Sequence, residues 1–407
     1  MHDPSREPED IQAAAASSLR PITQLEMALR FLKLGAIGFG GGVAVIALME
    51  QECVQRRQCV ETEEFLHGVG LGQILGPFAV NTAFFIGYRL FGLAGALLAQ
   101  VAFLAPSVLL VIGLSWLYFS FNQIPSLQGA LGGLAPVVIA LILSAAWSMG
   151  RKSVQSPISI ALLVAGVLGS IARINPVWIL AIAGSIGYFL KIGRPRSRSQ
   201  SAHGLLPLPL ALPGLPPTLS TTLPTTSTLS AVGLVPLALI FFKVGLVFFG
   251  GGFVLIPVLH QQLVTQLGWL TAREFIDGVA ISQLTPGPMA VLATFTGYRL
   301  AGIPGALAAT VALFLPATLL MWGISHFYER LRHVTAVKDF LAGVNPAVVG
   351  LILAAAIALA PSSLHWERPL SFGLCAIALL LLTRFKWHPA FVLAIGALTG
   401  TLASTWI

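Results

Sequence analysis

Charge is the scarcest property of this sequence. Only 9% of its 407 residues are charged and 56% are hydrophobic, with a mean hydropathy of +0.87, whereas soluble domains carry about 25% charged residues. So little charge excludes a protein whose whole surface faces water. Apolar runs of about 20 residues, long enough to span a bilayer, recur along most of the chain. Because open sheets cannot span lipid, the composition predicts an all-α polytopic membrane protein.

Residues that enzymes and metal sites use are also scarce. Cys53 and Cys59 have neither C-x-x-C nor zinc-knuckle spacing, and Cys375 stands apart. The eight histidines form no H-E-x-x-H motif, and G-x-S-x-G is absent. We therefore expect no enzyme activity, no metal and no cofactor. The net charge of +8 comes from basic residues in short loops beside apolar runs, which predicts orientation in a membrane and no nucleic-acid partner.

Two parts of the chain repeat each other. FLKLGAIGFGGG begins at Phe31, and FFKVGLVFFGGG begins at Phe241. At this fixed offset, 31–110 and 241–320 share roughly thirty identities over about eighty positions, which indicates a duplication. The chain therefore consists of two homologous halves.

A segment rich in proline, serine and threonine separates the halves, and its composition predicts a flexible linker. The first twenty residues lack the apolar core of a cleavable signal peptide. We divide the chain into a cytoplasmic N-terminal tail at 1–23, a first repeat at 24–193, the linker at 194–230 and a second repeat at 231–407. The apolar segments of the first repeat fall at 24–49, 65–88, 91–119, 129–149, 155–171 and 175–191. The whole chain then has about 10–13 transmembrane segments.

The second segment of each half is rich in helix breakers. It contains GVGLGQILGPFAVN at 68–81 and GVAISQLTPGPMAVL at 278–292. Proline and glycine at this density predict a broken or re-entrant segment. Positive charge follows the fourth and sixth segments in the first half, but the third and fifth segments in the second half. Loops at equivalent positions thus differ in charge, which favours inverted repeats.

Isolated cations recur at matching positions. Arg89 is the only charged residue between Gly68 and Gly150, and Arg299 occupies the same place in the second copy of GYRL. An intramembrane arginine either faces a polar cavity or extends its guanidinium to the headgroups. Lys33 and Lys243 leave the same two interpretations open.

The glycine triplets and proline turns offer backbone donors. Neither triplet has phosphate-loop spacing, but glycine runs either pack helices closely or point N–H groups at an anion. A helix that restarts after a break presents its positive end. The candidate anion-binding residues are Lys33, Gly40, Gly41, Gly42, Gln73, Gly76, Pro77, Asn81, Arg89, Lys243, Gly250, Gly251, Gly252, Gln283, Pro286, Gly287, Pro288 and Arg299. Coupling or gating candidates are Glu64, Glu274 and Asp277, for which helix capping is the alternative.

This inventory predicts a transporter for a hydrated, tetrahedral, multiply charged anion. Cations come in related pairs, and acids are almost absent from the apolar segments. A cation pump would show the opposite balance. The residues do not name the anion.

The sequence resembles the chromate ion transporter family in its long-chain, two-domain form. The resemblance rests on K-x-G-x-x-x-F-G-G-G at Lys33 and Lys243, on Gln283 followed by a Pro-Gly-Pro turn, and on G-Y-R in both halves. The resemblance covers both halves, and the motifs occur in the same order in each. The first copy departs from the pattern, because it lacks the first proline and one residue before Gly76.

The resemblance implies a multi-pass protein of the bacterial inner (cytoplasmic) membrane that exports chromate and confers chromate resistance. Efflux would be driven by membrane potential or coupled to protons. The alternatives are a permease for sulfate or another oxyanion, a membrane-bound chromate reductase, and a sensor or scaffold. The expected partners are chromate, with sulfate as a competing anion, and the lipid bilayer, and the state is a monomer or homodimer.

Overall fold

The structure is a computed structural model that describes residues 22–39, 41–121, 124–190, 233–248, 252–326, 335–364 and 369–404. The tail at 1–21 and the linker at 194–230 lie outside these residues. The described part of the chain is built from helices and contains no strand, as the composition predicts.

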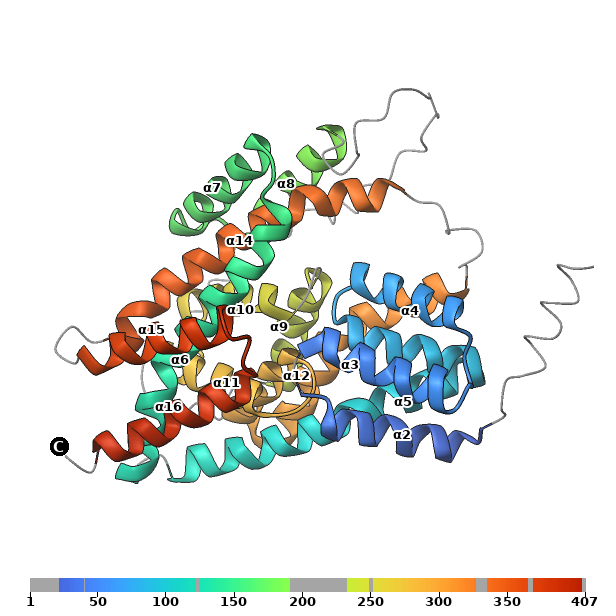
Figure 1. The fold of residues 1–407 in the computed structure, drawn as a ribbon, viewed down its shortest axis with the longest axis horizontal. Coiled ribbons are helices and arrows are strands. Elements are labelled where there is room, and N and C mark those ends of the chain that lie inside the picture. The colour runs from blue at the N-terminus through green and yellow to red at the C-terminus, as the bar shows by residue number, and fades with distance from the viewer. Residues whose placement is uncertain are drawn as a thin grey trace, which may run out of the picture.

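The two halves have related helix orders (Figure 1). The first half contains α2 (Gln24–Ile37), α3 (Gly41–Glu50), the π-helix η1 (Gln51–Arg56), α4 (Thr62–Ile74), α5 (Phe78–Phe121), α6 (Pro125–Ser153), α7 (Pro157–Ile171) and α8 (Pro176–Leu190). The second half contains α9 (Leu234–Leu246), the 3-10 helix η3 (Gly252–Val254), α10 (Leu255–Leu259), the π-helix η4 (His260–Gln266), α11 (Ala272–Leu284), the 3-10 helix η5 (Met289–Val291), α12 (Leu292–His326), α14 (Thr335–Ser363), α15 (Pro369–Thr383) and α16 (Pro389–Ser404).

Proline and glycine set many of these boundaries. Helices α6, α7, α8, α15 and α16 all begin with proline, whose fixed φ suits a first helical turn that needs no N–H partner. Gly92 has a φ of 63° and breaks α5 internally, and Gly302 breaks α12 in the same way with a φ of 60°. The predicted boundary between the second and third segments falls at this kink.

The first apolar segment differs from its prediction. The segment at 24–49 was expected to be continuous, but α2 ends at Ile37 and α3 starts at Gly41. Arg30 of α2 then pairs with Glu52 beyond α3, so the chain folds back on itself. The physical reason is the glycine run at 40–42, which weakens the helix where the chain reverses.

The second segment is re-entrant. Helix α4 and residues 78–90 of α5 run antiparallel and form what we call the first hairpin, with its tip at Leu75–Pro77. Its contacts are nested around the tip: Gly72 lies against Phe78, Gly68 against Phe85, and Glu64 pairs with Arg89. The second hairpin consists of α11, η5 and residues 292–300 of α12, with its tip at Thr285–Pro288. Gly278 lies against Phe295, and Glu274 pairs with Arg299.

The hairpins enter the bundle from opposite ends. After its kink at Gly92, α5 leaves the base of the first hairpin. Halfway along, the Ser107 hydroxyl donates to the carbonyl of Pro286 at the tip of the second hairpin. Near its end, Tyr118 donates to Asp277 near the base of the second hairpin. The end of α12 packs in turn against the first hairpin. This arrangement is that of inverted repeats.

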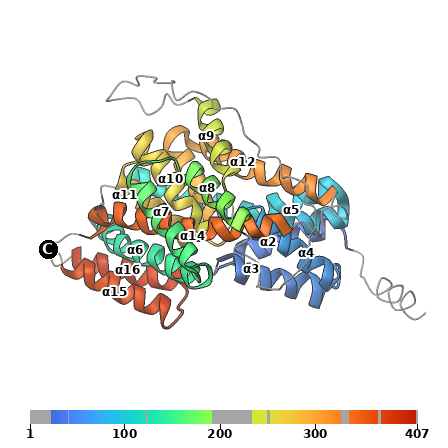
Figure 2. The ribbon, with the colours of Figure 1, turned by 90° about the horizontal axis from the view of Figure 1, so that it is seen from above.

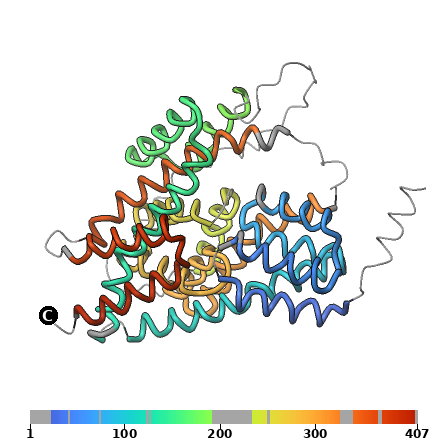
Figure 3. Tube along the Cα trace, in the orientation of Figure 1, coloured from blue at the N-terminus to red at the C-terminus, as the bar shows by residue number. Residues whose placement is uncertain are grey.

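The last helices of each half pack on the other half. Helices α7 and α8 lie along α14, and α15 and α16 lie along α6 (Figures 1 and 3). Figure 2 shows the same interleaving from above. The close approaches use glycine: a side chain at Gly133 would overlap the carbonyl of Gly396, and one at Gly343 would overlap that of Ala183. The halves are therefore interlocked rather than side by side.

Four helices in the described part of the chain are long and apolar enough to cross a membrane, by length and composition. They span 78–121, 127–153, 289–325 and 339–363. Shorter apolar helices at 157–171, 176–190, 234–246, 370–383 and 389–403 accompany them. The total of about 10–13 spans remains a prediction.

Candidate functional site

The chain breaks of both halves converge at one place. The Gly287 N–H at the second tip donates to the carbonyl of Gly38, where α2 ends, at 3.0 Å. Gly76 at the first tip lies against the carbonyl of Phe248, which occupies the position equivalent to Gly38 in the second half. The two tips thus dock on equivalent carbonyls of the opposite half. We call this region, residues 38–39, 41–42, 75–78, 248, 252 and 285–289, the central crossing.

Glycine is required at both tips by backbone conformation. Gly76 has a φ of +118° and Gly287 a φ of +100°, which side-chain-bearing residues rarely adopt. The equivalence of these residues also places the one-residue difference between the copies before the glycine. The first tip therefore makes the same turn as the Pro-Gly-Pro tip, without its first proline.

Several helices begin at the central crossing. Helix α3 starts at Gly41 and α5 at Phe78, and a side chain at Gly42 would overlap the Phe78 ring. In the second half, η3 starts at Gly252, close to Met289, which opens the continuous η5–α12 helix. Helix starts carry unpaired N–H groups and partial positive charge. The central crossing contains no acidic residue, so its electrostatics favour an anion.

Other candidate residues lie around this region. Asn81 is buried in α5, and its amide nitrogen has no hydrogen-bond partner among the described residues. Gln283 in α11 is half-buried and contacts the sulfur of Met289 at 3.8 Å. Gln73 lies in α4, one turn before the first tip. Gly40, Gly250 and Gly251 lie outside the described residues.

The structure separates the candidate arginines from the central crossing. Arg89 follows Pro77 by 12 residues, or roughly 18 Å of helix. It pairs with Glu64 at the base of the first hairpin. Arg299 pairs with Glu274 at 2.9 Å at the base of the second hairpin, and its guanidinium lies 5.2 Å from the centre of the Phe119 ring. Each arginine is thus partly neutralised by a glutamate, and the structure does not bring the two together.

The lysines occupy equivalent positions and face outward. Lys33 lies in α2 and Lys243 in the last turn of α9, and both are exposed. No ion-pair partner for either lies within the described ranges.

Two of the three acidic candidates, Glu274 and Asp277, lie near the base of the second hairpin, and Glu64 lies at the base of the first. Glu274 forms a capping box with Thr271 at the start of α11 and also pairs with Arg299, so the capping interpretation is confirmed for this residue. Asp277, one turn further on, is buried and contacts Arg273 and Tyr118.

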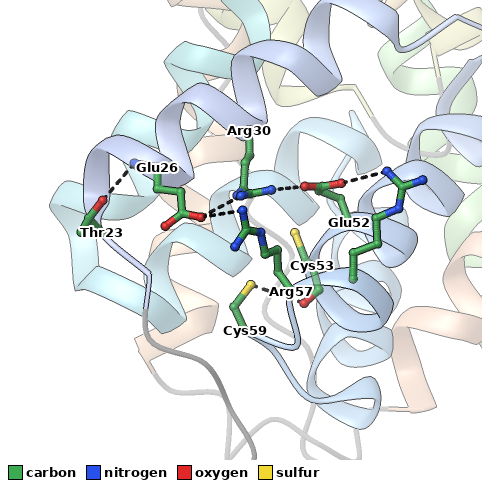
Figure 4. Close-up of polar contacts among 8 residues, drawn as sticks. Thr23, Glu26, Arg30, Glu52, Cys53, Arg57 and Cys59 are labelled. Atoms are coloured by element: carbon green, nitrogen blue, oxygen red, sulfur yellow. Dashed lines mark hydrogen bonds and ion pairs between the residues drawn. The ribbon is translucent and has the colours of Figure 1, made fainter.

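The first half carries a charged cluster whose equivalent positions in the second half are uncharged. Arg30 bonds to Glu26 at 2.7 Å and to Glu52, and Arg57 pairs with Glu26 at 3.2 Å (Figure 4). The cluster joins α2 to η1 and closes the chain reversal. Beside it, the Cys59 thiol donates to the Cys53 carbonyl at 3.4 Å. All three cysteines are free and buried.

Sequence reasoning did not identify the ion pairs, although a signal for them exists. Glu64 and Arg89 are equidistant from the midpoint between Gly76 and Pro77. A chain folded back at that midpoint brings them together. Ser107 and Tyr118 left no comparable signal, because their contacts join elements far apart in the sequence. Arg273 and Asp277 do carry a local signal, since they are four residues apart in one helix.

Two interlocked helical repeats, each with a re-entrant hairpin docked at a shared acid-free centre, define a membrane transporter built from inverted repeats. The chain belongs to the chromate transporter family, whose model matches residues 25–188 and 235–401.

Two relatives named as chromate transport proteins cover nearly the whole chain. A chromate transport protein of Cupriavidus metallidurans is 32% identical over 98% of this chain and 98% of its own length. A chromate transport protein of Pseudomonas aeruginosa is 33% identical over 95% of this chain and 93% of its own. The uncharacterized transporter YwrA of Bacillus subtilis is 32% identical over 41% of this chain and 95% of its own, which is the length of one repeat. No solved structure matches. These names indicate a transporter rather than an enzyme.

Proposed function

We propose that this protein exports chromate from the bacterial cytoplasm across the inner membrane and thereby confers chromate resistance. The observation that carries the proposal is the convergence of helix starts at the acid-free central crossing. Relatives named as chromate transport proteins over nearly the whole chain support chromate as the anion. Residues 24–193 and 231–407 act as the two transport repeats.

The central crossing binds the oxyanion through backbone N–H groups. Glycine leaves these groups uncovered, and the helix starts add partial positive charge. Gln73, Gln283 and Asn81 supply amide donors around it. Lys33 and Lys243 attract the anion toward this site from the surface. Binding by neutral donors holds a dianion without the tight ion pairs that would slow its release.

Arg89 and Arg299 act at the two bases. Each already has a glutamate partner, so an arriving dianion competes with Glu64 or Glu274 for the guanidinium. That competition makes the pairs gates that open in the presence of substrate. Membrane potential suffices for export, because moving two negative charges out of a negative cytoplasm releases about 4.6 kcal/mol per 100 mV.

The test is uptake of labelled chromate into everted vesicles with an interior-positive potential. We expect potential-driven uptake by the intact protein, and competition by excess sulfate would show how strictly chromate is selected. Gly287→Ala should abolish uptake, whereas Gly113→Ala, at a position with open space around it, should not. Arg89→Gln and Arg299→Gln should slow uptake. No uptake by the intact protein would refute the proposed substrate or direction.

A further inference from the structure

Asp277 is a buried carboxylate with one unsatisfied oxygen. Its side chain in α11 is 1% exposed. Oδ2 accepts hydrogen bonds from the Tyr118 hydroxyl at 3.0 Å and from Arg273 Nε at 3.2 Å. Oδ1 is also buried, and no donor among the described residues reaches it. Burial without a donor disfavours the charged form of a carboxyl group, so this oxygen is suited to carry a proton.

Few charged or titratable groups are found near this part of α11. Arg273 and Glu274 lie on α11 itself, Tyr118 on α5, Arg299 on α12 and His260 on η4. Two other helices that pack on α11 carry charge near one end: α6 has Arg151 and Lys152 in its last turn, and α14 has Lys338 and Asp339 near its start. Helices α16 and η5 contain none. His260 packs edge-to-face against Phe275, and burial lowers the pKa of its imidazole, which favours the neutral ring. Arg273 is therefore the charge closest to Asp277.

The first hairpin shows that the carboxylate is not required by the fold. The position equivalent to Asp277 is His67, which lies near Glu63 at 3.8 Å. Both hairpins have the same shape, although one carries a buried acid there and the other a histidine. A buried charge that the shared fold does not need, joined to Tyr118 of the other half, points to a role in function.

We propose that Asp277 binds a proton and that its protonation frees Arg273 to bind an oxyanion at the base of the second hairpin. While Asp277 is ionised, it holds the Arg273 guanidinium, whose side chain is 37% exposed. When Oδ1 takes up a proton, Asp277 becomes neutral and Arg273 loses its counter-charge. A cation near the mouth of the proposed pathway is then available to the anion. This inference rests on the proposed function, because the anion is its substrate.

A proton fits the site better than a metal ion. Hard metal cations take about six oxygen ligands, whereas Asp277 offers one free oxygen. No group of three or more histidine, cysteine, aspartate or glutamate side chains able to hold a metal occurs in the described part of the chain. Because linkage is reciprocal, proton binding and anion binding must strengthen each other.

The test is the pH dependence of the KM for chromate in everted vesicles at a fixed potential. In the intact protein, KM should fall as pH falls, by up to about tenfold per pH unit for a single coupled proton. Asp277→Asn mimics the protonated state, so the KM of this variant should be low and should no longer change with pH. Arg273→Gln should raise KM and remove the pH dependence. Protonation of chromate itself affects all variants equally and therefore cancels in the comparison.

Controls separate this inference from the proposed function. Asp339→Asn removes another buried carboxylate, and His260→Gln removes the nearby imidazole; both should keep the pH dependence of the intact protein. Infrared titration of purified protein should show a protonated carboxyl band that Asp277→Asn removes and Asp339→Asn retains. The proton site would be overturned if the KM of Asp277→Asn still depended on pH, or if the protonated carboxyl band remained in this variant. Absence of chromate uptake in the intact protein would instead overturn the proposed function, while the infrared result would still decide whether Asp277 binds a proton.

Discussion

Gly287→Ala should destabilise the protein strongly for two separable reasons. The φ of +100° at this residue costs a side-chain-bearing residue about 1–3 kcal/mol. A methyl group there would also overlap the Ser107 hydroxyl, which donates to the carbonyl of Pro286. Displacing that hydroxyl loses a hydrogen bond worth about 0.5–1.5 kcal/mol. The sum is about 1.5–4.5 kcal/mol, and at roughly 2 °C per kcal/mol the Tm should fall by about 3–9 °C.

Thermal unfolding of purified protein in detergent measures this effect. Gly113→Ala is the matched control, because nothing lies within 4 Å of a methyl group there, and alanine should stabilise this helix by up to about 1 kcal/mol. Adding Ser107→Ala to Gly287→Ala removes the overlap but keeps the backbone strain, so the double variant should be less unstable than the sum of the single effects. Equal Tm values for Gly287→Ala and Gly113→Ala would refute the reasoning.

Three further outcomes follow from the structure. Glu274→Gln should lower the free energy of unfolding by about 1–2 kcal/mol, since it weakens both a helix cap and an ion pair. Glu64→Gln should lower it by less than about 1 kcal/mol, since the arginine that pairs with Glu64 is half exposed. Equal Tm shifts for the two variants would contradict this. Gly343→Leu should prevent accumulation of folded protein, because α8 leaves no space for a side chain, and a monodisperse gel-filtration peak would contradict it. Fragments 1–193 and 231–407 should be stable only when co-expressed, because the halves interlock, and a soluble, folded single fragment in detergent would be evidence against interlocking.

Breaks in the helices were predictable because they depend on local chemistry. Glycine and proline disrupt a helix wherever they cluster, so 68–81 and 278–292 reveal a turn without any knowledge of neighbours. The same rule applies at 40–42, where one continuous segment was predicted. There, Arg30 and Glu52 are equidistant from Gly41, so charges spaced evenly about a glycine run mark a reversal.

Contacts between the halves were not predictable because they depend on packing. Nothing near Gly38 in the sequence indicates that its carbonyl accepts from Gly287, and nothing near Asp277 indicates that Tyr118 reaches it. Gly343 is one of many glycines in apolar segments, and only the structure shows which of them allow helices to touch. Duplication indicated two similar halves, but similarity does not say how they interlock.

The differences between the halves concern their ends more than their meeting point. Both tips carry a positive-φ glycine on an equivalent carbonyl, and both bases carry an arginine–glutamate pair. Away from these, the first half has the charged cluster around Arg30, and the second has the buried Asp277, one of whose oxygens has no donor among the described residues. The membrane potential and the concentration gradients set the direction of net transport, so a structural difference between the halves cannot create that direction. Asymmetry does set the affinity at each mouth, and a pathway with one proton-sensitive mouth binds and releases its anion under different conditions on the two sides of the membrane.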